Sequence, residues 1–470
     1  MITAKKIDLK GIVLIDHMGQ KHVDLKNICV DFSIYEDILS PYITADMTLS
    51  DATGLIETLP IIGEETVIIK FRSFGEEELE YSTYNFVVDG PSSRSKTEER
   101  LETYVVHMIS PEAVVNTMTE STAGYVGKTI KNIVETEYER HFTNSNLVFG
   151  IKDDPYLTQK PPGIVVGDTD GLHSFVAPSS TAFEFIKQLT HQAASKDYKE
   201  SDFVFYRNRD EYRFETFSEL MTKDAVETYT YADPDVEKNN PKPGLKNTES
   251  HQIIYHVEYK SLPSTSDRIA AGMIETQTIA FDPVLKTFTT SDFRYARDFS
   301  KQGFTGLGGY SVKGPLSVHE DSNKPIFHSR MFAVDSKKSE VSYMEDKEND
   351  NNIDFPKTRQ NFSDIQTSKM AQIKQGTRLA LTIPGANNRT VGEVINILLP
   401  QNATHSALNT RYNILFTKNA QDSRFLITAL VHNYNAAEAE YYTRIEVIKE
   451  TYANPISKAN AILNEGDDWS

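Results

Sequence analysis

Short segments in which apolar and polar residues alternate recur through the first hundred or so residues, and they constrain the fold more than any other feature. In 65–72 the apolar residues Val67, Ile69 and Phe71 occupy every second position, which is the period of a half-buried strand. Further strand candidates, separated by turn-forming clusters, are Asp8–Leu14, Ile28–Ser33, Ala45–Leu49, Tyr81–Val88 and Leu101–Ile109. So many short strands without intervening helices favour an antiparallel barrel or sandwich.

Helical periodicity replaces this alternation near residue 115. An amphipathic helix is predicted over Gly127–His141 because its apolar residues recur on one face. A second helix is predicted to begin at Thr181, which forms a capping box with Glu184. A hairpin follows, with strands Phe203–Tyr206 and Tyr212–Phe214. These elements predict a small α/β unit inserted between two β regions.

A second set of strands follows a linker at 233–244 that is rich in proline, asparagine and charge. Strands resume at Ile253–Tyr259, and an irregular region at about 291–360 carries a glycine-rich patch and an acidic run. A short helix is predicted to begin at Ser363, where Gln366 completes a capping box. The later strands are predicted at Leu379–Ile383, Val391–Leu399, Tyr412–Phe416, Phe425–Tyr434 and Tyr441–Ile448.

The two β regions share an order of features. In each, a strand leads through a glycine-containing turn to another strand, and two long strands close the region. Any two antiparallel domains share turns and alternation. The pattern alone therefore leaves both duplication and two unrelated β domains open.

Composition and charge exclude several classes of protein. Apolar residues make up 39% of the 470 residues, which is enough for hydrophobic cores and excludes a wholly disordered chain. The net charge of −18 opposes sequence-independent binding to phosphate backbones and to anionic membranes. Cys29 is the only cysteine, so an intramolecular disulfide framework is excluded and folding in a reducing compartment is indicated. We expect no cleaved signal peptide and no membrane insertion, since no stretch approaches the about 18 apolar residues that a span needs.

No motif predicts catalysis, a cofactor or a metal. Gly124–Thr129 ends like a phosphate-binding loop, but the first glycine of that motif would fall at Thr122, so a helix start is the simpler interpretation. Asp168–Gly171 begins like a calcium loop, yet Leu172 occupies the next ligand position. The twelve histidines form no short-spacing zinc signature. We therefore predict no catalytic, cofactor-binding or metal-binding residue, and the sequence identifies no interface residue.

Motifs in both β regions resemble those of one family of assembly proteins. Segments that resemble the second tube-like domain of the baseplate hub proteins of contractile-tailed phages and of type VI secretion spike proteins are Met370–Gln372, Leu379–Gly385, Val391–Pro400 and Phe425–His432. Segments that look like the first tube-like domain of these hubs are Ser33–Ile38, Ala45–Asp51 and Leu59–Glu65. Thr181–Ile186 is similar to part of their inserted α/β domain, whereas 291–360 has no counterpart.

The resemblance implies a mainly β fold with α+β insertions, made of two tail-tube-like antiparallel β-barrel domains and an inserted α/β domain. The boundaries that we expect are 1–115 for the first barrel, 116–240 for the inserted domain, 241–290 with 376–455 for the second barrel, 291–375 for an insertion with loops and a short helix, and 456–470 for a C-terminal tail.

The resemblance also implies a structural, non-enzymatic subunit in the baseplate of a virion tail, assembled in the host cytoplasm. Such hubs form homotrimers that adapt the six-fold ring of tail tube protein to the three-fold central spike, beside other baseplate (wedge) proteins. DNA passes through the lumen without specific binding, and the net charge predicts an acidic lumen. The spike is expected to be a separate chain, because no repetitive needle sequence follows the second β region.

Three alternatives remain at this point. A tail-associated hydrolase would need a convergent acid and base, for which the sequence offers no candidate. A distal-tail or receptor-binding ring protein would share the β-rich composition but would not need two barrels of the same topology. A cytosolic metabolic enzyme would need a cofactor fingerprint, and none is present.

Overall fold

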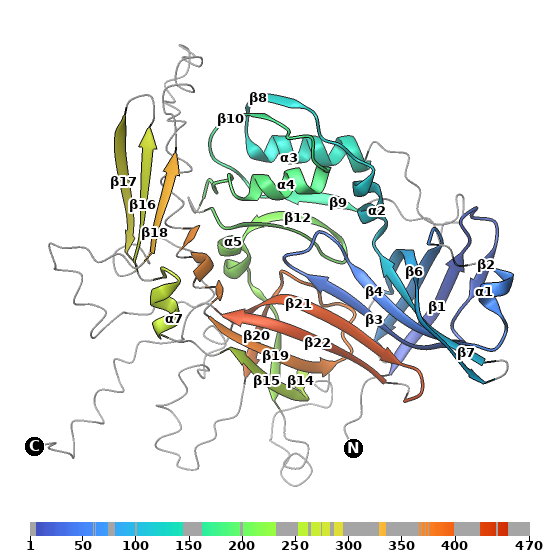
Figure 1. The fold of residues 1–470 in the computed structure, drawn as a ribbon. Coiled ribbons are helices and arrows are strands. Elements are labelled where there is room, and N and C mark those ends of the chain that lie inside the picture. Colours follow the sequence, from blue (N-terminus) through green and yellow to red (C-terminus); the bar gives the residue numbers. More distant parts are fainter. Residues whose placement is uncertain are drawn as a thin grey trace, which may run out of the picture.

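The described residues form one large curled sheet, an α/β unit on one side of it and a small separate sheet (Figure 1). The computed structural model describes residues 6–59, 61, 63–73, 80–98, 101–143, 162–197, 201–231, 252–261, 265–273, 275–282, 286–294, 329–334, 366–398 except 368, 372 and 375, 424–438 and 440–449. The predicted fold class, mainly β with α+β insertions, is confirmed.

The first β region folds as its alternating sequence predicts. In β5 (Thr66–Ser73), the side chains of Val67, Ile69 and Phe71 are all buried in one hydrophobic core. The other elements of this region are β1 (Ile7–Ile15), β2 (His22–Asp24), β3 (Cys29–Asp37), β4 (Thr44–Asp51), α1 (Leu55–Thr58), β6 (Ser82–Glu98) and β7 (Leu101–Ile109).

The second β region has a core of its own, to which Leu381, Ile397 and Ile445 belong. Its strands are β13 (Ala225–Tyr231), β14 (Ile253–Ile254), β15 (His256–Ser261), β19 (Thr377–Pro384), β20 (Val394–Leu398), β21 (Arg424–Asn435) and β22 (Glu440–Lys449). The strands predicted from 379 onward are thus present with small shifts of their ends, except that Tyr412–Phe416 lies outside the described residues.

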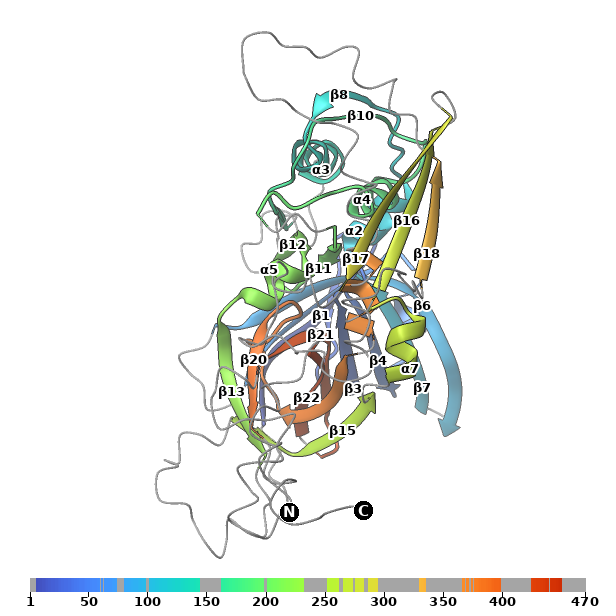
Figure 2. The same cartoon turned by 90° about the vertical axis from the view of Figure 1, so that its left-hand side faces the viewer.

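Both regions belong to a single fourteen-stranded sheet. The first region is ordered β2-β1-β5-β6-β7-β4-β3, and β3 then pairs with β21 of the second region. The second region is ordered β13-β20-β21-β22-β19-β15, with β14 beside β13. Each region therefore curls as a half-barrel, and Figure 2 looks along the curl of the second.

The two regions match strand for strand. In chain order, β1, β3, β4, β5, β6 and β7 correspond to β13, β15, β19, β20, β21 and β22, and the same strands are neighbours in each sheet segment. An irregularity is repeated as well: one extra residue interrupts the register with the following strand, at Asp89 in β6 and at Thr428 in β21. The predicted common strand order is confirmed, and superposition of the two regions stays a prediction.

Two strand pairings differ from the predicted domain boundaries. β13 lies in the segment assigned to the inserted domain, but it pairs with β20 of the large sheet, where Tyr229 is buried in the second core. β16 (Glu275–Asp282) lies in the segment assigned to the second barrel, but it forms a separate sheet with β17 (Thr287–Arg294) and β18 (Ser329–Val334). A short helix, α7 (Thr265–Ala270), precedes this sheet.

Several predicted features lie outside the described residues. They are the linker at 233–244, most of the irregular region at 291–360, the start of the helix at Ser363 and the tail at 456–470.

The inserted α/β unit lies above the large sheet in Figure 1. The capping box of Thr181 and Glu184 is confirmed, and so is the hairpin after it. The first predicted helix is shorter than expected, because Gly124–Lys128 pairs as a strand and the helix begins only at Ile130. The elements are α2 (Pro111–Thr117), β8 (Gly124–Lys128), α3 (Ile130–Tyr138), the π-helical turn η1 (Glu139–Thr143), β9 (Gly163–Val166), β10 (His173–Val176), α4 (Ala182–Thr190), β11 (Phe203–Arg207), β12 (Glu211–Thr216) and α5 (Phe217–Thr222).

Candidate functional site

The two β regions are joined by strand pairing between β3 and β21, and we call this contact the internal junction. Asp31–Asp37 of β3 run antiparallel to Ala429–Asn435 of β21 over seven residue pairs. In the middle of the junction, the Oγ of Ser33 donates a hydrogen bond to Oδ1 of Asn433 at 2.9 Å. The junction makes the two sheet segments continuous, so neither β3 nor the outer half of β21 is an open edge.

A buried carboxylate lies at one end of the internal junction. Glu36 of β3 is only 1% exposed. One of its oxygens accepts hydrogen bonds from Oγ1 of Thr390 at 2.5 Å and from the backbone N–H of Val391 at 3.3 Å. The other accepts from the hydroxyl of Tyr84 at 3.1 Å. Burial raises the pKa of Glu36, because removal from water disfavours the charged carboxylate.

The loop after β19, residues 385–391, brings all three parts of the molecule together. Asn387 contacts the first region: its Oδ1 accepts from the backbone N–H of Ser73 at 3.1 Å, and its Nδ2 donates to Oγ of Ser82 at 3.0 Å. From the inserted unit, Arg209 donates to the backbone oxygen of Asn387 at 2.6 Å. The three parts are therefore fixed to one another by polar contacts across a single loop.

Glycine is required at the first residue of this loop and again just after its last residue. A Cβ on Gly385 would overlap the ring of Tyr441, and one on Gly392 would overlap the hydroxyl of Tyr206. Gly392 also has a φ of +84°, in the left-handed region that other residues rarely adopt. Gly385 and Gly392 lie in two of the segments that carry the family resemblance, and these close approaches give a physical reason for both glycines.

Arg209 reaches the loop from the turn of the β11–β12 hairpin. The turn is shaped by Asn208, whose Oδ1 accepts from the backbone N–H groups of Asp210 and Glu211 at 3.0 and 2.7 Å. The guanidinium of Arg209 binds Asp210 through two hydrogen bonds of 2.9 and 2.8 Å. Burial opposes ionisation of Asp210, but these bonds prevail and lower its pKa.

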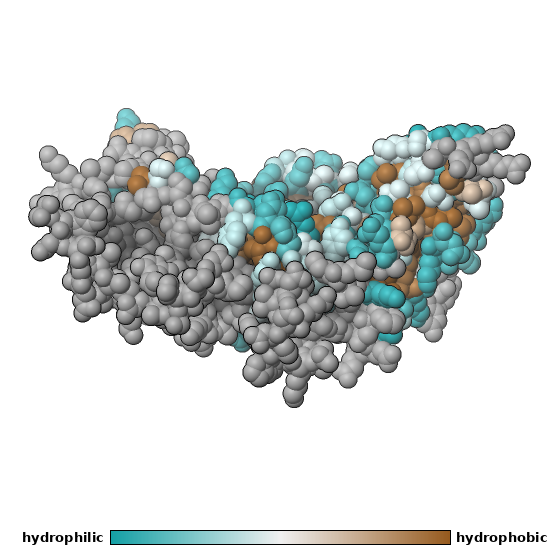
Figure 3. Space-filling view, turned by 90° about the horizontal axis from the view of Figure 1, so that it is seen from below, coloured by the Kyte–Doolittle hydropathy of each residue, from teal (hydrophilic) through white to brown (hydrophobic). Residues whose placement is uncertain are grey.

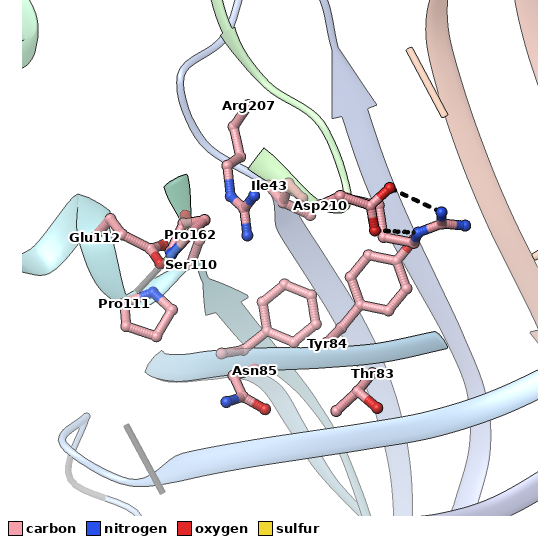
Figure 4. Close-up of a pocket in the computed structure, with 12 residues that line it drawn as sticks. Ile43, Thr83, Tyr84, Asn85, Ser110, Pro111, Glu112, Pro162, Arg207 and Asp210 are labelled. Carbon is pink, nitrogen blue, oxygen red and sulfur yellow. Dashed lines mark hydrogen bonds and ion pairs between the residues drawn. The ribbon is translucent and has the colours of Figure 1, made fainter. Parts of the chain in front are cut away.

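Two cavities adjoin this arginine. One, of about 70 Å³, is lined by side chains that include Tyr84, Glu112 and Arg207 (Figure 4). It has room for a few water molecules but not for the drug-sized ligands that occupy pockets of about 300 Å³ or more. The other is a polar groove of about 440 Å³ whose lining includes Glu80, Arg209 and Asn387, already hydrogen-bonded to one another.

A buried histidine lies behind the internal junction. His432 of β21 is 0% exposed, and its Nδ1 forms a hydrogen bond of 2.9 Å with the hydroxyl of Tyr441. Its ring packs edge-on against Phe71 and Tyr84 of the first region. Burial, and secondarily the charge of Arg209, lower the pKa of His432 to about 3, so the ring is neutral at ordinary pH.

The inserted unit holds a second buried carboxylate, Glu137, beside a serine and a histidine. Oγ of Ser121 donates to Glu137 at 2.5 Å, and Nε2 of His141 lies 3.2 Å from the same oxygen. A serine-histidine-acid triad needs the histidine between the other two residues. Here both partners bind one oxygen, and Ser121 is 0% exposed. The cluster therefore has the geometry of a structural network.

The motifs weighed in the sequence have structural roles in the fold. Gly127 and Lys128 belong to β8, and Oγ1 of Thr129 caps α3 by accepting the N–H of Asn132 at 3.2 Å. Asp168 of the calcium-like segment pairs with Lys131 at 2.8 Å. Within the described ranges no group of three His, Cys, Asp or Glu residues could hold a metal ion. Over the same residues, no helix has the length and apolarity to cross a membrane.

The sequence alone does not mark Glu36, Arg209, Asn387 or His432 as site residues. Glu36 had a detectable signal: in β3 the even positions Phe32 and Ile34 point into the core, so alternation places the next even position, Glu36, on the same buried face. Arg209 and Asn387 had none, because both lie in polar turns whose partners are far away in sequence.

Comparison with known proteins finds similarity in structure only. No family model and no curated protein matches the sequence. The 43 kDa tail protein of prophage MuSo2 from Shewanella oneidensis is 11% identical with a TM-score of 0.50, and the match covers 94% of this chain and 98% of that one. A tail protein from Neisseria meningitidis MC58 is 9% identical with a TM-score of 0.49, covering 93% and 96%. The E. coli c3393 protein, a component of the type VI secretion system, is 10% identical with a TM-score of 0.40, covering 96% and 79%. The match to the MuSo2 tail protein, which spans nearly the whole of both chains, shows that the two proteins share a fold.

Proposed function

We propose that this chain is a structural baseplate hub subunit, forming a homotrimeric ring that adapts a six-fold tail tube to a three-fold spike. The observation that carries the proposal is the duplicated strand order, together with the internal junction that joins the two copies edge to edge. Three chains with two similar half-barrels each present six similar units on one face. The same three chains keep three-fold symmetry wherever their insertions differ.

The proposed division of the chain follows strand pairing. The first tube-like unit is 1–110, shorter than the predicted 1–115 because its last strand, β7, ends at Ile109. The second unit comprises β13, β14, β15 and β19 to β22. The inserted unit is then 111–224, and the sheet of β16, β17 and β18 belongs to a separate insertion. Differences between the insertions would supply the three-fold features of the ring.

The partners that we propose are other copies of the chain, the tail tube ring, the central spike and further baseplate proteins. The E. coli c3393 protein is described as similar to the T4 tail proteins gp27 and gp5, in line with a spike-associated role. The net charge of −18 suits a channel that passes DNA without specific binding, since acidic walls repel phosphate.

Figure 3 shows hydrophobic side chains between hydrophilic ones on the lower face, toward the end occupied by the first β region.

We further propose that the chain is not an enzyme, acts in the virion tail baseplate and is assembled in the host cytoplasm. Glu36 at the junction and Glu137 in the inserted unit, two of the buried carboxylates, are surrounded by hydrogen-bond donors from the chain itself. Neither carboxylate is paired with an accessible nucleophile, which is what a hydrolase would need.

The proposal is tested by mass and by shape. Native mass spectrometry of the purified chain should find a species of about three times the chain mass of 53.1 kDa. Electron microscopy of the assembled tail should show this protein in a three-fold ring with a central hole. A single copy per tail, or a ring with a different number of chains, would contradict the hub role. Hydrolysis of cell-wall material by the purified chain would favour the alternative of a tail-associated hydrolase.

A further inference from the structure

The duplication makes it possible to ask what the internal junction corresponds to elsewhere on the chain. Its two strands are β3 and β21, whose counterparts in the other region are β15 and β6. The correspondence extends to single hydrogen bonds: the N–H of Val88 donates to the oxygen of Glu65 and the N–H of Ile427 to that of Glu393, both at 2.8 Å and both next to the repeated bulge. If the junction were repeated between copies, β15 would pair with β6.

The outer part of β6 has an open edge. β5 pairs with β6 only as far as Val87, and beyond that residue β6 pairs with β7 on one side only within the described part of the chain. Over the corresponding part of β21, Ala429–Asn435, the same side holds β3. The segment Gly90–Lys96 is also largely exposed. Apart from Pro91, which has no N–H, its residues present backbone donors and acceptors to a strand that the described residues of the single chain do not supply.

The edge of β15 is open in the same way. This strand pairs with β19 on one side and, among the described residues, with nothing on the other. Tyr259 is the counterpart of Ile34, yet it is 50% exposed whereas Ile34 is 0% exposed. This correspondence follows from residues that pair across successive strands. In the first region these residues are Val88, Met108, Ala45 and Ile34, and in the second they are Ile427, Val447, Leu379 and Tyr259.

We propose that β15 of one copy pairs antiparallel with β6 of the next copy, along residues 257–261 of β15 and 92–96 of β6, and so repeats the internal junction between chains. The inference rests on the proposed ring, and it identifies the strands that close it. Each chain has one edge of each kind, so the contact is head-to-tail. A closed ring leaves neither edge open, which is how natural sheets avoid uncontrolled pairing.

Charges on the two edges are complementary. Ser95 is the counterpart of Asn433, because it pairs with Thr103 as Asn433 pairs with the corresponding Tyr442. Ser33 is paired with Asn433 at the internal junction. In the contact between chains, their counterparts Glu258 and Ser95 would be opposite each other, with Arg94 next to Ser95. Arg94 is 48% and Glu258 44% exposed in the single chain, where Arg94 pairs with Glu102 and Glu258 pairs with Lys260 and Arg444. Pairing of the two edges would add an ion pair between chains to these exposed pairs.

Cysteine cross-linking tests the pairing directly. In the full chain carrying Glu258→Cys and Ser95→Cys, mild oxidation should yield a covalent species of three chains, because opposite residues on paired strands have Cβ atoms about 4.5–5.5 Å apart. Ser33→Cys with Asn433→Cys is the matched control, since these residues are opposite each other within one chain. That pair should cross-link without any increase in mass.

A second pair tests another open edge of the sheet among the described residues, β2. If Glu258→Cys cross-links between chains with Val23→Cys of β2 and not with Ser95→Cys, the inference is wrong. A trimer in native mass spectrometry without a β15–β6 cross-link overturns the inference and leaves the proposed function intact. A chain that is monomeric at all concentrations and forms no cross-link overturns both.

Charge reversal gives a second measurement that does not depend on cysteine. Glu258→Arg should weaken trimer formation about threefold to fivefold, in the range of an exposed ion pair. Adding Arg94→Glu to that variant should restore most of the loss. Equal weakening in the single and double variants would contradict the proposed register.

Discussion

The first and second β regions build the same ladder of strands but begin it differently. β1 enters antiparallel to β5, whereas its counterpart β13 runs parallel to β20. The chain reaches β13 from α5 of the inserted unit, so this strand starts at the opposite end of the sheet. The remaining five strands of each region keep their order and their antiparallel directions. The repeated unit is therefore the ladder of five antiparallel strands. The direction of the strand beside it, β1 or β13, depends on the part of the chain that comes before it.

A single position shows how the two ladders were adapted to different surroundings. Asp51 at the end of β4 corresponds to Gly385 just after β19. The correspondence follows from the register in which β4 pairs with β7 and β19 pairs with β22. Asp51 accepts hydrogen bonds from the backbone N–H groups of Thr53 and Leu55, at 2.7 and 2.6 Å. At Gly385 the corresponding space is filled by the ring of Tyr441, which belongs to the core of the first region. The second region thus has no side chain at this position, and the ring of Tyr441, part of the first region's core, occupies the space.

The largest effect is expected from restoring a side chain at that position. Gly385→Ala should lower the free energy of unfolding by about 3 kcal/mol or more, since its Cβ would overlap a ring that cannot move within a packed core. Chemical denaturation measures the loss. The matched control is Gly124→Ala in β8, where a Cβ would meet nothing within 4 Å, and it should change stability by less than about 0.5 kcal/mol. Similar losses in both variants would contradict the role given to Tyr441.

Removing the carboxylate at the internal junction should have the next largest effect. Glu36→Ala leaves Thr390, Val391 and Tyr84 without their shared acceptor, which should cost about 2–3 kcal/mol. Glu438→Ala, at an exposed turn between β21 and β22, is the control and should be nearly neutral.

The carboxyl group of Glu36 should also make the stability of the fold depend on pH. The folded-state pKa of Glu36 is raised above 4.5 by burial, so its stabilising contribution is full below pH 4.5 and is lost as the pH rises through the folded-state pKa. Glu36→Gln should remove that part of the dependence. An unchanged profile in the Gln variant would show that Glu36 is not the group responsible.

His432 should produce the opposite dependence. Its pKa falls from 6.5 to about 3 on folding, so stability is full above pH 6.5 and is lost as the pH falls toward about 3. The slope from this one residue is about 1.4 kcal/mol per pH unit within that window. The slope should vanish in His432→Phe but persist in the control His17→Asn, which alters an exposed turn. Urea denaturation at a series of pH values provides the measurement.

The smallest effect is expected at the first-region counterpart of Gly385. Asp51→Ala removes the acceptor that orders the turn before α1 and should cost about 1 kcal/mol. Burial opposes ionisation of Asp51, but its hydrogen bonds hold its pKa below 3.8, so its contribution is present above pH 3.8 and is lost below it. Asp224→Ala, at an exposed position before β13, is the control. A greater loss for Asp51→Ala than for Gly385→Ala would reverse the comparison between the regions.

The sequence predicted local structure well and long-range partners poorly. Alternation identified β5 and β22, and the Thr181 capping box located the start of α4, because these signals depend on neighbouring residues. β13 was placed in the inserted unit because its partner, β20, lies more than 150 residues further along the chain. Nothing in a short window distinguishes a strand that completes a local sheet from one that joins a distant one.

The candidate site could not be predicted either, because its residues meet through long-range contacts. Arg209 lies in a hairpin turn and Asn387 in a loop, both of which predict exposure when taken alone. Their contact joins two parts of the chain that only the completed fold brings together. Glu36 is the exception, because its position in the alternation of β3 already indicated a charged group on an inward face.

The separation of β3 and β21 along the chain has a consequence for synthesis. The residues hydrogen-bonded at the internal junction, Ser33 and Asn433, are 400 positions apart. At the usual rate of about 5–20 residues per second, the edge of β3 leaves the ribosome some 20–80 seconds before its permanent partner is made. An inward-pointing charge on an edge strand disfavours pairing with other chains. Until the loop at 385–391 supplies Thr390 and Val391 as hydrogen-bond donors, Glu36 is a charge of this kind on the edge of β3. Pairing with β21 then completes the junction.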